Sequence, residues 1–173
     1  MAPTRPWVCS RAVGDVLEVA AGTGANLEYY DADATLTLTD WSVGMLDQAR
    51  AKAARLGRAV EFRQADAMAL PFDDASFDTV VATFSMCGVP QVSGALDEAV
   101  RVLRPGGRLL LVDHVISTAL PVRLLQRALE SVTKHKGEYW TRRPLKDLRG
   151  VEVVELQRSH FGVLERVHAE KPS

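Results

Sequence analysis

Short runs of apolar residues recur along the chain between polar turns, and they follow two different periods. Runs that alternate or are rich in β-branched residues predict strands at residues 16–20, 35–39, 60–65, 77–84, 108–113, 151–158 and 164–170. The segments between them predict helices over residues 25–30, 43–56, 91–103 and 120–134. The run at 77–84 is largely apolar, which is typical of a strand buried on both faces.

The order of these elements predicts an α/β fold. Helices or longer loops separate the first five strands, which suits parallel strands joined by crossovers. Only residues 159–163 separate the last two strands, and this is too short for a parallel crossover. We therefore expect a doubly wound, Rossmann-like, mostly parallel sheet of seven strands with a C-terminal antiparallel hairpin.

The first strand runs directly into a turn that contains Gly22 and Gly24. Glycine permits positive φ and lets a ligand approach the backbone, and a helix that starts here would offer unpaired N–H groups. These features predict a nucleotide-like ligand above the end of the first strand. The alternative is a plain strand-to-helix turn, which is common in α/β proteins.

A carboxylate, Asp40, follows the second strand. In a right-handed βαβ unit it lies at the carboxyl edge beside the glycine turn, where it can accept hydrogen bonds from the two hydroxyls of a ribose. Alternatively, Asp40 caps the helix at 43–56, although Ser42 can do this instead. Trp41 and Met45 are then expected near an adenine ring.

A second carboxylate, Asp66, follows the third strand in the same way. It suits a donor such as the exocyclic amine of adenine, and the alternative is an aspartate that caps the loop after it. Two strand-end carboxylates beside a glycine turn strengthen the prediction of a nucleotide-like ligand.

Composition narrows the class of protein. The 173 residues predict one domain, and a net charge of −1 argues against a protein built chiefly to hold nucleic acid. No apolar run approaches the roughly 20 residues of a membrane helix, and the chain start lacks the apolar core of a signal peptide. Cys9 and Cys87 have no paired spacing, so we predict no metal site and no disulfide, and we expect a cytoplasmic protein.

With these residues in place, the chain resembles the class I S-adenosylmethionine-dependent methyltransferases, in particular the group similar to the ubiquinone and menaquinone biosynthesis methyltransferases (methyltransferase type 11 domain). The resemblance covers about residues 14–115 and rests on five segments taken in order. They are Leu17-Glu18-Val19-Ala20-Ala21-Gly22-Thr23-Gly24, Thr39-Asp40-Trp41-Ser42-Val43-Gly44-Met45-Leu46, Ala65-Asp66-Ala67, 70–78 (Leu-Pro-Phe-Asp-Asp-Ala-Ser-Phe-Asp) and Arg101-Val102-Leu103-Arg104-Pro105-Gly106-Gly107.

The resemblance implies S-adenosylmethionine as the cofactor and a set of residues that hold it. The turn from Glu18 to Gly24 would hold the methionine part, Asp40 the ribose, and Asp66 with the Ala67 backbone the adenine. Thr83 and Phe84, at the end of the fourth strand, would border the methionine part and the methyl group. The full set of expected cofactor-binding residues is Glu18, Ala20, Gly22, Thr23, Gly24, Asn26, Asp40, Trp41, Met45, Ala65, Asp66, Ala67, Thr83 and Phe84.

Two features depart from the family's pattern. Ala20 stands where the family usually has its first glycine, and because a methyl group is small we expect cofactor binding to survive. The family also commonly has a longer N-terminal helical cap, whereas residues 1–14 have room for at most a short turn of helix. This leaves open whether the chain start is truncated or another subunit covers the site. The oligomeric state also stays open, and a dimer is one of the options.

Methyl transfer to a small-molecule acceptor depends mainly on positioning, and whether a thiol, amine or hydroxyl acceptor here also uses a base stays open. His114, after the fifth strand, is the candidate base, with Asp113 and His135 as further candidates. The alternative for His114 is a structural histidine at a strand end. Cys87 is a candidate for the lining of the acceptor site, although a packed cysteine is the default reading.

Residues 116–150 form the expected acceptor-side insert, between the cofactor-binding core at 14–115 and the hairpin at 151–171 of one domain, 1–173. From Arg123 to Arg149 there are 8 Lys/Arg and 3 acids, a local net charge of +5. This favours an anionic acceptor or an anionic surface such as a lipid headgroup, although a solvated helix face looks similar. Reversing the charges of Lys134 and Lys136 is expected to raise the KM of the acceptor.

Two other functions stay open. A nicotinamide-dependent oxidoreductase usually has a third glycine in its turn, where this chain has Leu27 and Glu28. A non-catalytic S-adenosylmethionine-binding protein is the other alternative, because the short N-terminus leaves the acceptor pocket uncovered.

Overall fold

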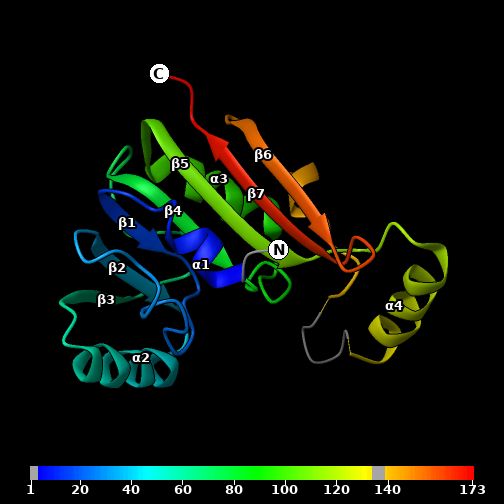
Figure 1. Cartoon of the computed structure of the whole chain (residues 1–173), viewed down its shortest axis with the longest axis horizontal. Helices are drawn as coiled ribbons and strands as arrows, with labels where there is room; N and C mark the ends of the chain where they lie inside the picture. Colours follow the sequence, from blue (N-terminus) through cyan, green and yellow to red (C-terminus); the bar gives the residue numbers. More distant parts are fainter. Residues whose placement is uncertain (1–3, 134–138) are drawn as a thin grey trace.

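The computed structural model describes residues 4–133 and 139–173, and its strands form one seven-stranded sheet in the order β3-β2-β1-β4-β5-β7-β6 (Figure 1). β1 pairs in parallel with both β2 and β4, while β7 runs antiparallel to β5 and to β6. The predicted fold class, including the C-terminal antiparallel hairpin, is therefore confirmed. The strands are β1 Asp15–Glu18, β2 Thr35–Asp40, β3 Val60–Gln64, β4 Phe77–Thr83, β5 Leu103–His114, β6 Glu152–Ser159 and β7 Leu164–Glu170.

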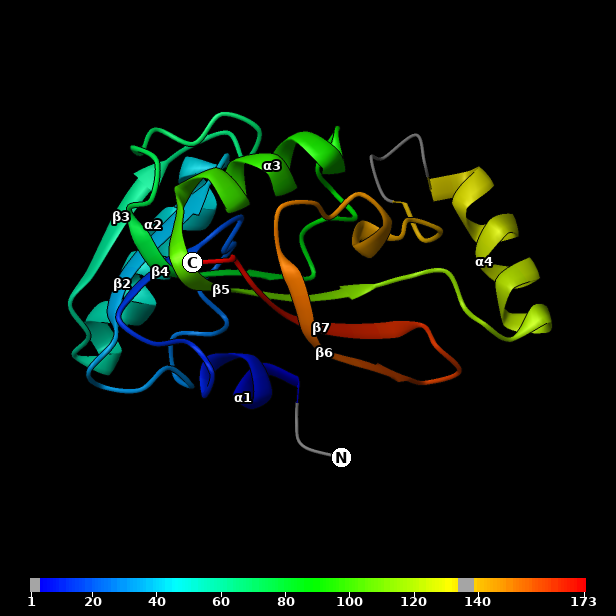
Figure 2. The same ribbon diagram turned by 90° about the horizontal axis from the view of Figure 1, so that it is seen from above.

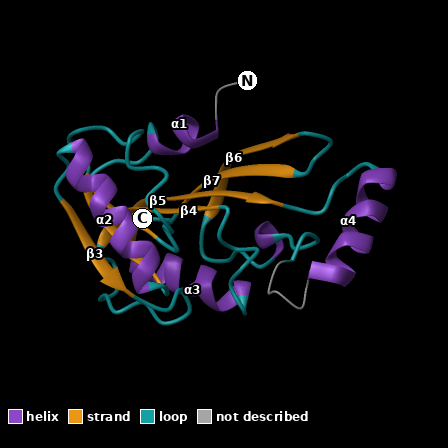
Figure 3. Cartoon of the chain, turned by 90° about the horizontal axis from the view of Figure 1, so that it is seen from below, coloured by secondary structure: helices purple, strands orange, loops and turns teal. Residues whose placement is uncertain are grey.

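Helices cover both faces of the sheet. They are α1 Thr4–Cys9, α2 Val43–Leu56, α3 Val92–Val102 and α4 Leu120–Thr133, with the 3₁₀ helix η2 at Pro144–Lys146. Figures 2 and 3 show α1 and α3 on opposite faces of the sheet. No helix among the described residues is long and apolar enough to cross a membrane.

Alternation along the central strands builds the two halves of the core. Leu17 and Val80 point to the cluster that holds the buried face of α3, whereas Val16 and Val81 point to the cluster shared with α1 and α2. A strand exposes successive side chains on opposite faces, so these neighbouring pairs serve different layers. The largely apolar run at 77–84 follows from this burial on both faces.

The helix α2 follows local rules closely. Ser42 caps it, because its side chain accepts a hydrogen bond from the Met45 backbone N–H. Gly57 ends it with φ of 65°, a left-handed conformation that glycine adopts without strain. The prediction that Ser42 caps this helix is therefore confirmed, and the ligand-binding role of Asp40 stays a prediction.

The helix predicted at residues 25–30 is wrong. Residues 22–29 form successive turns, in which the N–H of Leu27 bonds the carbonyl of Gly24 and that of Tyr29 bonds the carbonyl of Asn26. Asn26 is fully buried and its side chain bonds other core groups, so tertiary contacts override the weak helical preference of a six-residue segment. The predicted helix N-terminus is therefore absent from the glycine turn.

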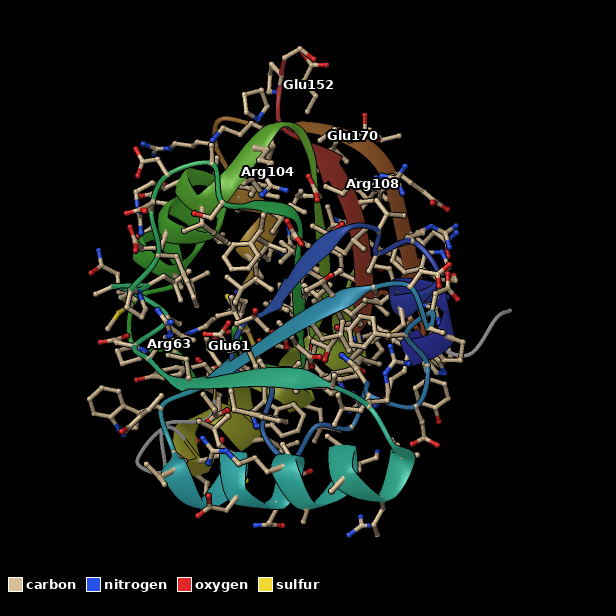
Figure 4. The ribbon with its side chains drawn as sticks, turned by 90° about the vertical axis from the view of Figure 1, so that its left-hand side faces the viewer. Glu61, Arg63, Arg104, Arg108, Glu152 and Glu170 are labelled. Atoms are coloured by element: carbon tan, nitrogen blue, oxygen red, sulfur yellow. The ribbon has the colours of Figure 1, made fainter. Side chains whose placement is uncertain are left out.

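Charged side chains pair at the edge of the sheet where β1 and β4 begin. Arg104 lies between Asp15 at 3.0 Å and Asp78 at 2.7 Å, and it therefore ties the start of β5 to β1 and β4. Figure 4 labels Arg104 at this end, together with Arg108, Glu152 and Glu170; Glu61 and Arg63 of β3, also labelled, form an ion pair at 2.9 Å. The pairs of Arg104 therefore join the amino ends of β1 and β4 to the start of β5.

Candidate active site

A cavity of about 470 Å³ opens at the carboxyl ends of β1, β2, β3 and β4. The strand order reverses beside β1, which lies between β2 and β4, and such a switch point is the usual ligand crevice of an open α/β sheet. Seven of the predicted cofactor-binding residues line it: Ala20, Asp40, Trp41, Ala65, Asp66, Ala67 and Phe84.

Asp40 ties two segments of the cavity together. Its Oδ2 accepts a hydrogen bond of 2.8 Å from the N–H of Gly22, and its Oδ1 accepts one of 2.8 Å from the N–H of Ser42. A carboxylate has about four acceptor positions, so each oxygen keeps one for a ligand. The two backbone hydrogen bonds thus fix the orientation of the carboxylate, and each oxygen can still accept a hydrogen bond from a ligand.

Two residues that line the cavity have left-handed backbone conformations, Ala20 with φ of 51° and Phe84 with φ of 54°. Ala20 follows β1 and Phe84 follows β4, and at each of these two positions the backbone turns sharply to leave the sheet. Positive φ strains a residue with a Cβ, and such strain is concentrated at functional sites. A glycine would therefore suit the position of Ala20 on conformational grounds alone.

The wall that follows β3 is held from α3. Asp66 Oδ1 accepts the N–H of Met68 at 2.9 Å. Glu98 accepts the N–H of Leu70 at 2.7 Å, and Arg101 bonds Glu98 and the carbonyl of Leu70. The Arg101 guanidinium lowers the pKa of Glu98, so the pair stays charged and anchors this wall.

A protein-family model described as a methyltransferase domain matches residues 17–111, which is more than half of the chain and includes all seven predicted residues that line the cavity. The chain belongs to the methyltransferase domain family. A phosphatidylethanolamine N-methyltransferase from Cereibacter sphaeroides is 40% identical over 118 residues, 67% of this chain and 58% of the relative. A demethylmenaquinone methyltransferase from Clavibacter sepedonicus is 42% identical over 120 residues, 69% of this chain and 47% of the relative.

The chain therefore spans about half the length of these curated relatives. Among solved structures, a protein from Bacillus halodurans C-125 matches with a TM-score of 0.80 at 22% identity, covering 92% of this chain and 93% of the other. A SAM-dependent methyltransferase from Methanosarcina mazei matches with a TM-score of 0.73 at 22% identity, covering 91% and 92%. The predicted family, the fold and the cofactor are confirmed, and the oxidoreductase alternative is not favoured.

The cavity of this methyltransferase domain fits its cofactor in size and in chemistry. Asp40 offers two oriented carboxylate oxygens, and Asp66 has a second oxygen with no hydrogen-bond partner among the described residues. Ala65, Ala67 and Met68 add apolar surface to the same wall, which suits a flat heterocycle. The residues present therefore match the donors and the apolar face of an adenosyl group.

The other predicted cofactor residues lie outside the lining of the cavity. Buried Glu18 and Asn26 form a network behind it with half-buried Thr83, in which the Asn26 amide donates to Glu18 at 2.9 Å and to Thr83 at 3.0 Å. Gly22 reaches the cavity through its bond to Asp40. The remaining three are Thr23 and Met45, which are exposed, and Gly24, which is buried.

Gly24 is required by packing. A Cβ at this position would lie 2.6 Å from Leu27 Cδ1 and 3.1 Å from Ala49 Cβ. The residue also has φ of 70°, so a side chain here would be strained as well as obstructed. Packing of the turn against Leu27 and α2 is therefore one reason for a glycine at this position, and the predicted contact of Gly24 with the cofactor stays a prediction.

Glu18 is buried at 2% exposure, and its two oxygens accept hydrogen bonds from Asn26 and from the Tyr30 hydroxyl at 2.8 Å. Burial raises the pKa of this carboxyl from 4.5 to about 7, although both hydrogen bonds and the guanidinium of Arg5 act in the opposite direction. Arg5 also donates to Asn26 at 2.7 Å and lies over the Phe84 ring, so the short α1 contributes to the site.

The cavity wall after β4 was not assigned from the sequence. Ser85, Gly88, Val89 and Pro90 form this wall, and Thr39 and Met68 line other parts of the cavity. The signal was present for residues 85–90, because they follow a predicted strand just as Asp40 and Asp66 do. No local signal points to the two groups that hold this segment, which come from distant parts of the chain.

Those two groups are Asp113 and Arg142. Asp113 accepts the N–H of Met86 at 2.7 Å, and burial raises its pKa. Arg142 donates to the carbonyls of Met86 at 2.9 Å and of Val89, and its guanidinium stacks on Tyr139. Asp113, which we considered as a base, is thus engaged in shaping the wall.

His114 lies beside the site and outside the lining of the cavity. Its ring is 4.9 Å from that of Phe84 and 5.9 Å from that of Trp140, measured between centroids. Cys87 also lies outside the lining, and burial raises the pKa of its thiol to about 11. His135, Lys134 and Lys136 lie outside the described residues.

Proposed function

We propose that the protein is an S-adenosylmethionine-dependent methyltransferase that transfers a methyl group to a small-molecule acceptor. The observation that carries this proposal is the cavity at the switch point of the sheet, with Asp40 and Asp66 at the ends of β2 and β3, in a chain of the methyltransferase domain family. The names of the relatives support an acceptor that is a small lipid-soluble molecule.

When bound, S-adenosylmethionine supplies an activated methyl group on a sulfonium sulfur. In this proposal Asp40 accepts hydrogen bonds from the ribose hydroxyls, and Asp66 accepts one from the adenine amine. Residues Glu18 to Gly24, with Asn26 and Thr83, hold the methionine part from behind. Charge-assisted hydrogen bonds of this kind are worth about 1.5–3 kcal/mol each.

The work of the remaining side chains is to position the acceptor and to exclude water. The segment 84–90, held by Asp113 and Arg142, is the wall that an acceptor would meet. Phe84 lies in it with its ring against His114. An acceptor approaching this wall would be surrounded mainly by apolar side chains, which supports a displacement reaction shielded from water.

Calorimetry with S-adenosylmethionine and S-adenosylhomocysteine, with NAD as the negative control, tests the cofactor site. We expect micromolar binding of both sulfur cofactors and at least about tenfold weaker binding in Asp40→Ala, since charge-assisted bonds are lost. Asp40→Asn separates the two roles of Asp40, because the amide oxygen still accepts one backbone N–H while the charge is lost. The exposed Asp33→Ala is the matched control.

Failure of the intact chain to bind either sulfur cofactor would contradict the proposal. If binding is confirmed, transfer of labelled methyl to a panel of quinones, phospholipids and small amines identifies the acceptor. Binding without transfer to any acceptor would favour the non-catalytic alternative.

A base role for His114 stays a prediction. It is supported by the contact between its ring and Phe84, which lines the cavity. We expect His114→Gln to lower kcat at neutral pH and to leave the Kd for S-adenosylmethionine unchanged. An unchanged kcat, with Phe84 still in place, would assign His114 to packing.

We propose further that residues 1–173 act as one domain in the cytoplasm, with 14–115 holding the cofactor, 116–150 on the acceptor side and 151–171 forming the hairpin. The shared sheet and the two free cysteines support this arrangement. Limited proteolysis tests it, since one domain predicts that cuts within 116–150 leave the rest associated. Cell fractionation tests the location.

A further inference from the structure

A second cavity, of about 360 Å³, lies between α4 and the segment that contains η2. Figures 1 and 2 show α4 beyond the carboxyl end of β5, apart from the rest of the fold. Arg123 and Arg127 line the cavity from α4, and Arg143 and Lys146 line it from the facing segment. We call this cavity the basic groove.

The orientation of α4 fixes the shape of the basic groove. Gln126, at 5% exposure, accepts the N–H of Ser117 and donates to the carbonyls of Val115 and Trp140. Glu130 accepts bonds from the N–H groups of Trp140 and Thr141 and from the Thr141 hydroxyl. The polar side of α4 therefore faces the protein, and Arg123 and Arg127, one turn apart, are held beside it.

The positive charge of the basic groove is not neutralised within the described residues. Arg123, Arg127, Arg143 and Lys146 form no ion pair there, and the nearest acid on α4, Glu130, is engaged by three hydrogen bonds. One carboxylate, Asp147, lines the groove, so four cations face one anion. In addition, the Nε of Arg123 is buried without any hydrogen-bond partner.

A buried guanidinium nitrogen without an acceptor is costly, and an anion bound at the outer nitrogens of Arg123 would offset part of the cost of holding this charge in place. Two guanidinium groups one turn apart, opposite another guanidinium and an ammonium group, match the several oxygens of a phosphate group, which arginine recognises with paired bonds. Thr141 also lines the groove, but its hydroxyl donates to Glu130, so the four cationic side chains are the donors left for a ligand. These groups together favour a tetrahedral oxyanion over a single carboxylate.

We propose that the basic groove binds a phosphate group, carried either by a soluble phosphate ester or by a lipid headgroup. The groove is separate from the cofactor cavity. Arg142 points to the wall at residues 84–90, whereas its neighbours Thr141 and Arg143 line the basic groove. This inference therefore does not depend on methyl transfer.

Binding is measured on the full chain without cofactor, using inorganic phosphate and glycerol 1-phosphate in calorimetry and phosphatidylglycerol vesicles in sedimentation. Vesicles of phosphatidylcholine are the control for surface charge. We expect Arg123→Gln/Arg127→Gln to weaken binding at least about tenfold, since charge-assisted bonds are lost. Arg143→Gln/Lys146→Gln tests the opposite wall independently, so one poorly folded variant does not decide the result.

Two matched variants sharpen the test. Arg55→Gln removes an exposed cation of α2 and is expected to change nothing. Asp147→Asn removes the one carboxylate of the groove and is expected to tighten binding severalfold. Binding should also weaken as ionic strength rises, because the groove is open to solvent.

Binding of the soluble phosphates that both groove variants lose would support the proposal with a soluble ester as the ligand. Binding of phosphatidylglycerol vesicles alone, lost in the same variants, would support it with a lipid headgroup. No binding of any probe, or equal binding by wild type and groove variants, would overturn it. The groove variants should keep the wild-type Kd for S-adenosylmethionine, so failure here leaves the cofactor site untouched.

Discussion

Glu18→Gln is the change that tests the buried network behind the cofactor cavity. Glu18 is buried under the glycine turn, with Asn26 and Tyr30 donating to its carboxylate oxygens. Burial raises its pKa from 4.5 to about 7. The folded protein therefore holds a proton on Glu18 in a pH range where the unfolded chain has lost it.

The sign and size of the effect follow from this difference. Between about pH 4.5 and pH 7 the folded state binds more protons than the unfolded state, so the free energy of unfolding falls as the pH rises. The contribution is complete below pH 4.5 and is lost as the pH passes through about 7. A shift from 4.5 to about 7, at roughly 1.4 kcal/mol per unit, gives a total loss of about 3–4 kcal/mol over the whole range.

Gln has nearly the shape of Glu and does not ionise, so in Glu18→Gln the free energy of unfolding no longer falls with pH on account of residue 18. Urea unfolding of both chains at pH 5, 6, 7 and 8 measures the difference, followed by tryptophan fluorescence, to which buried Trp7 contributes a change on exposure. Subtracting the two curves cancels other titrating groups, including His168, whose pKa burial lowers and whose effect has the opposite sign.

The difference between wild type and Glu18→Gln should change by about 2–3 kcal/mol from pH 5 to pH 8, because part of the loss falls below pH 5, with the variant gaining relative stability at high pH. Asp33→Asn, on an exposed residue, is the control and should run parallel to wild type. A Glu18→Gln curve parallel to that of wild type would show that the pKa of Glu18 is ordinary and would refute the reasoning.

Three further predictions concern Ala20, which lines the cavity, and Ser42 and Cys87, which lie near it. Ala20→Gly should raise the free energy of unfolding, measured in urea, by about 0.5 kcal/mol. The strain of Ala20 in the left-handed conformation, about 1–2 kcal/mol, is removed, and this exceeds the cost of the greater conformational entropy of Gly in the unfolded chain. A clear loss of stability would contradict this prediction. Ser42→Ala should lower it by about 1 kcal/mol through loss of the α2 cap, and Ser42→Asn should restore most of it. The pKa of Cys87 is raised from 9.0 to about 11, so at pH 8 its thiol should react with iodoacetamide about a hundredfold more slowly than an ordinary thiol. Mass spectrometry follows the labelling. Labelling at the ordinary rate would show that burial does not raise the pKa of this thiol.

The strands and the positions of the strand-end carboxylates could be predicted because they depend on local patterns. Alternation with a period of two identifies a strand wherever it lies, and the carboxyl ends of parallel strands share one edge of the sheet. Asp40 and Asp66 therefore line one cavity, as expected. The short separation of β6 and β7 likewise left only the antiparallel pairing.

Other features depend on partners that are distant in the chain. The helix expected at residues 25–30 gives way to turns because Asn26 is drawn into the core by Glu18 and Thr83, and the latter is 57 residues away. The wall at residues 84–90 is held in position by Arg142, which donates a hydrogen bond to the carbonyl of Met86, 56 residues away in the sequence. No local pattern carries such information.

The sequence by itself determined the α/β fold, the family and the strand ends at which a cofactor can bind, since hydrophobic period and turn residues act over short distances. Only the tertiary structure decided which way the amphipathic α4 faces, and its polar side lies against the protein because Gln126 and Glu130 satisfy buried backbone groups there. It also decided that Gly24 is needed for packing and that Glu18 is buried. These outcomes depend on which groups meet across the fold, because the cost of burial is set by the surroundings of a side chain.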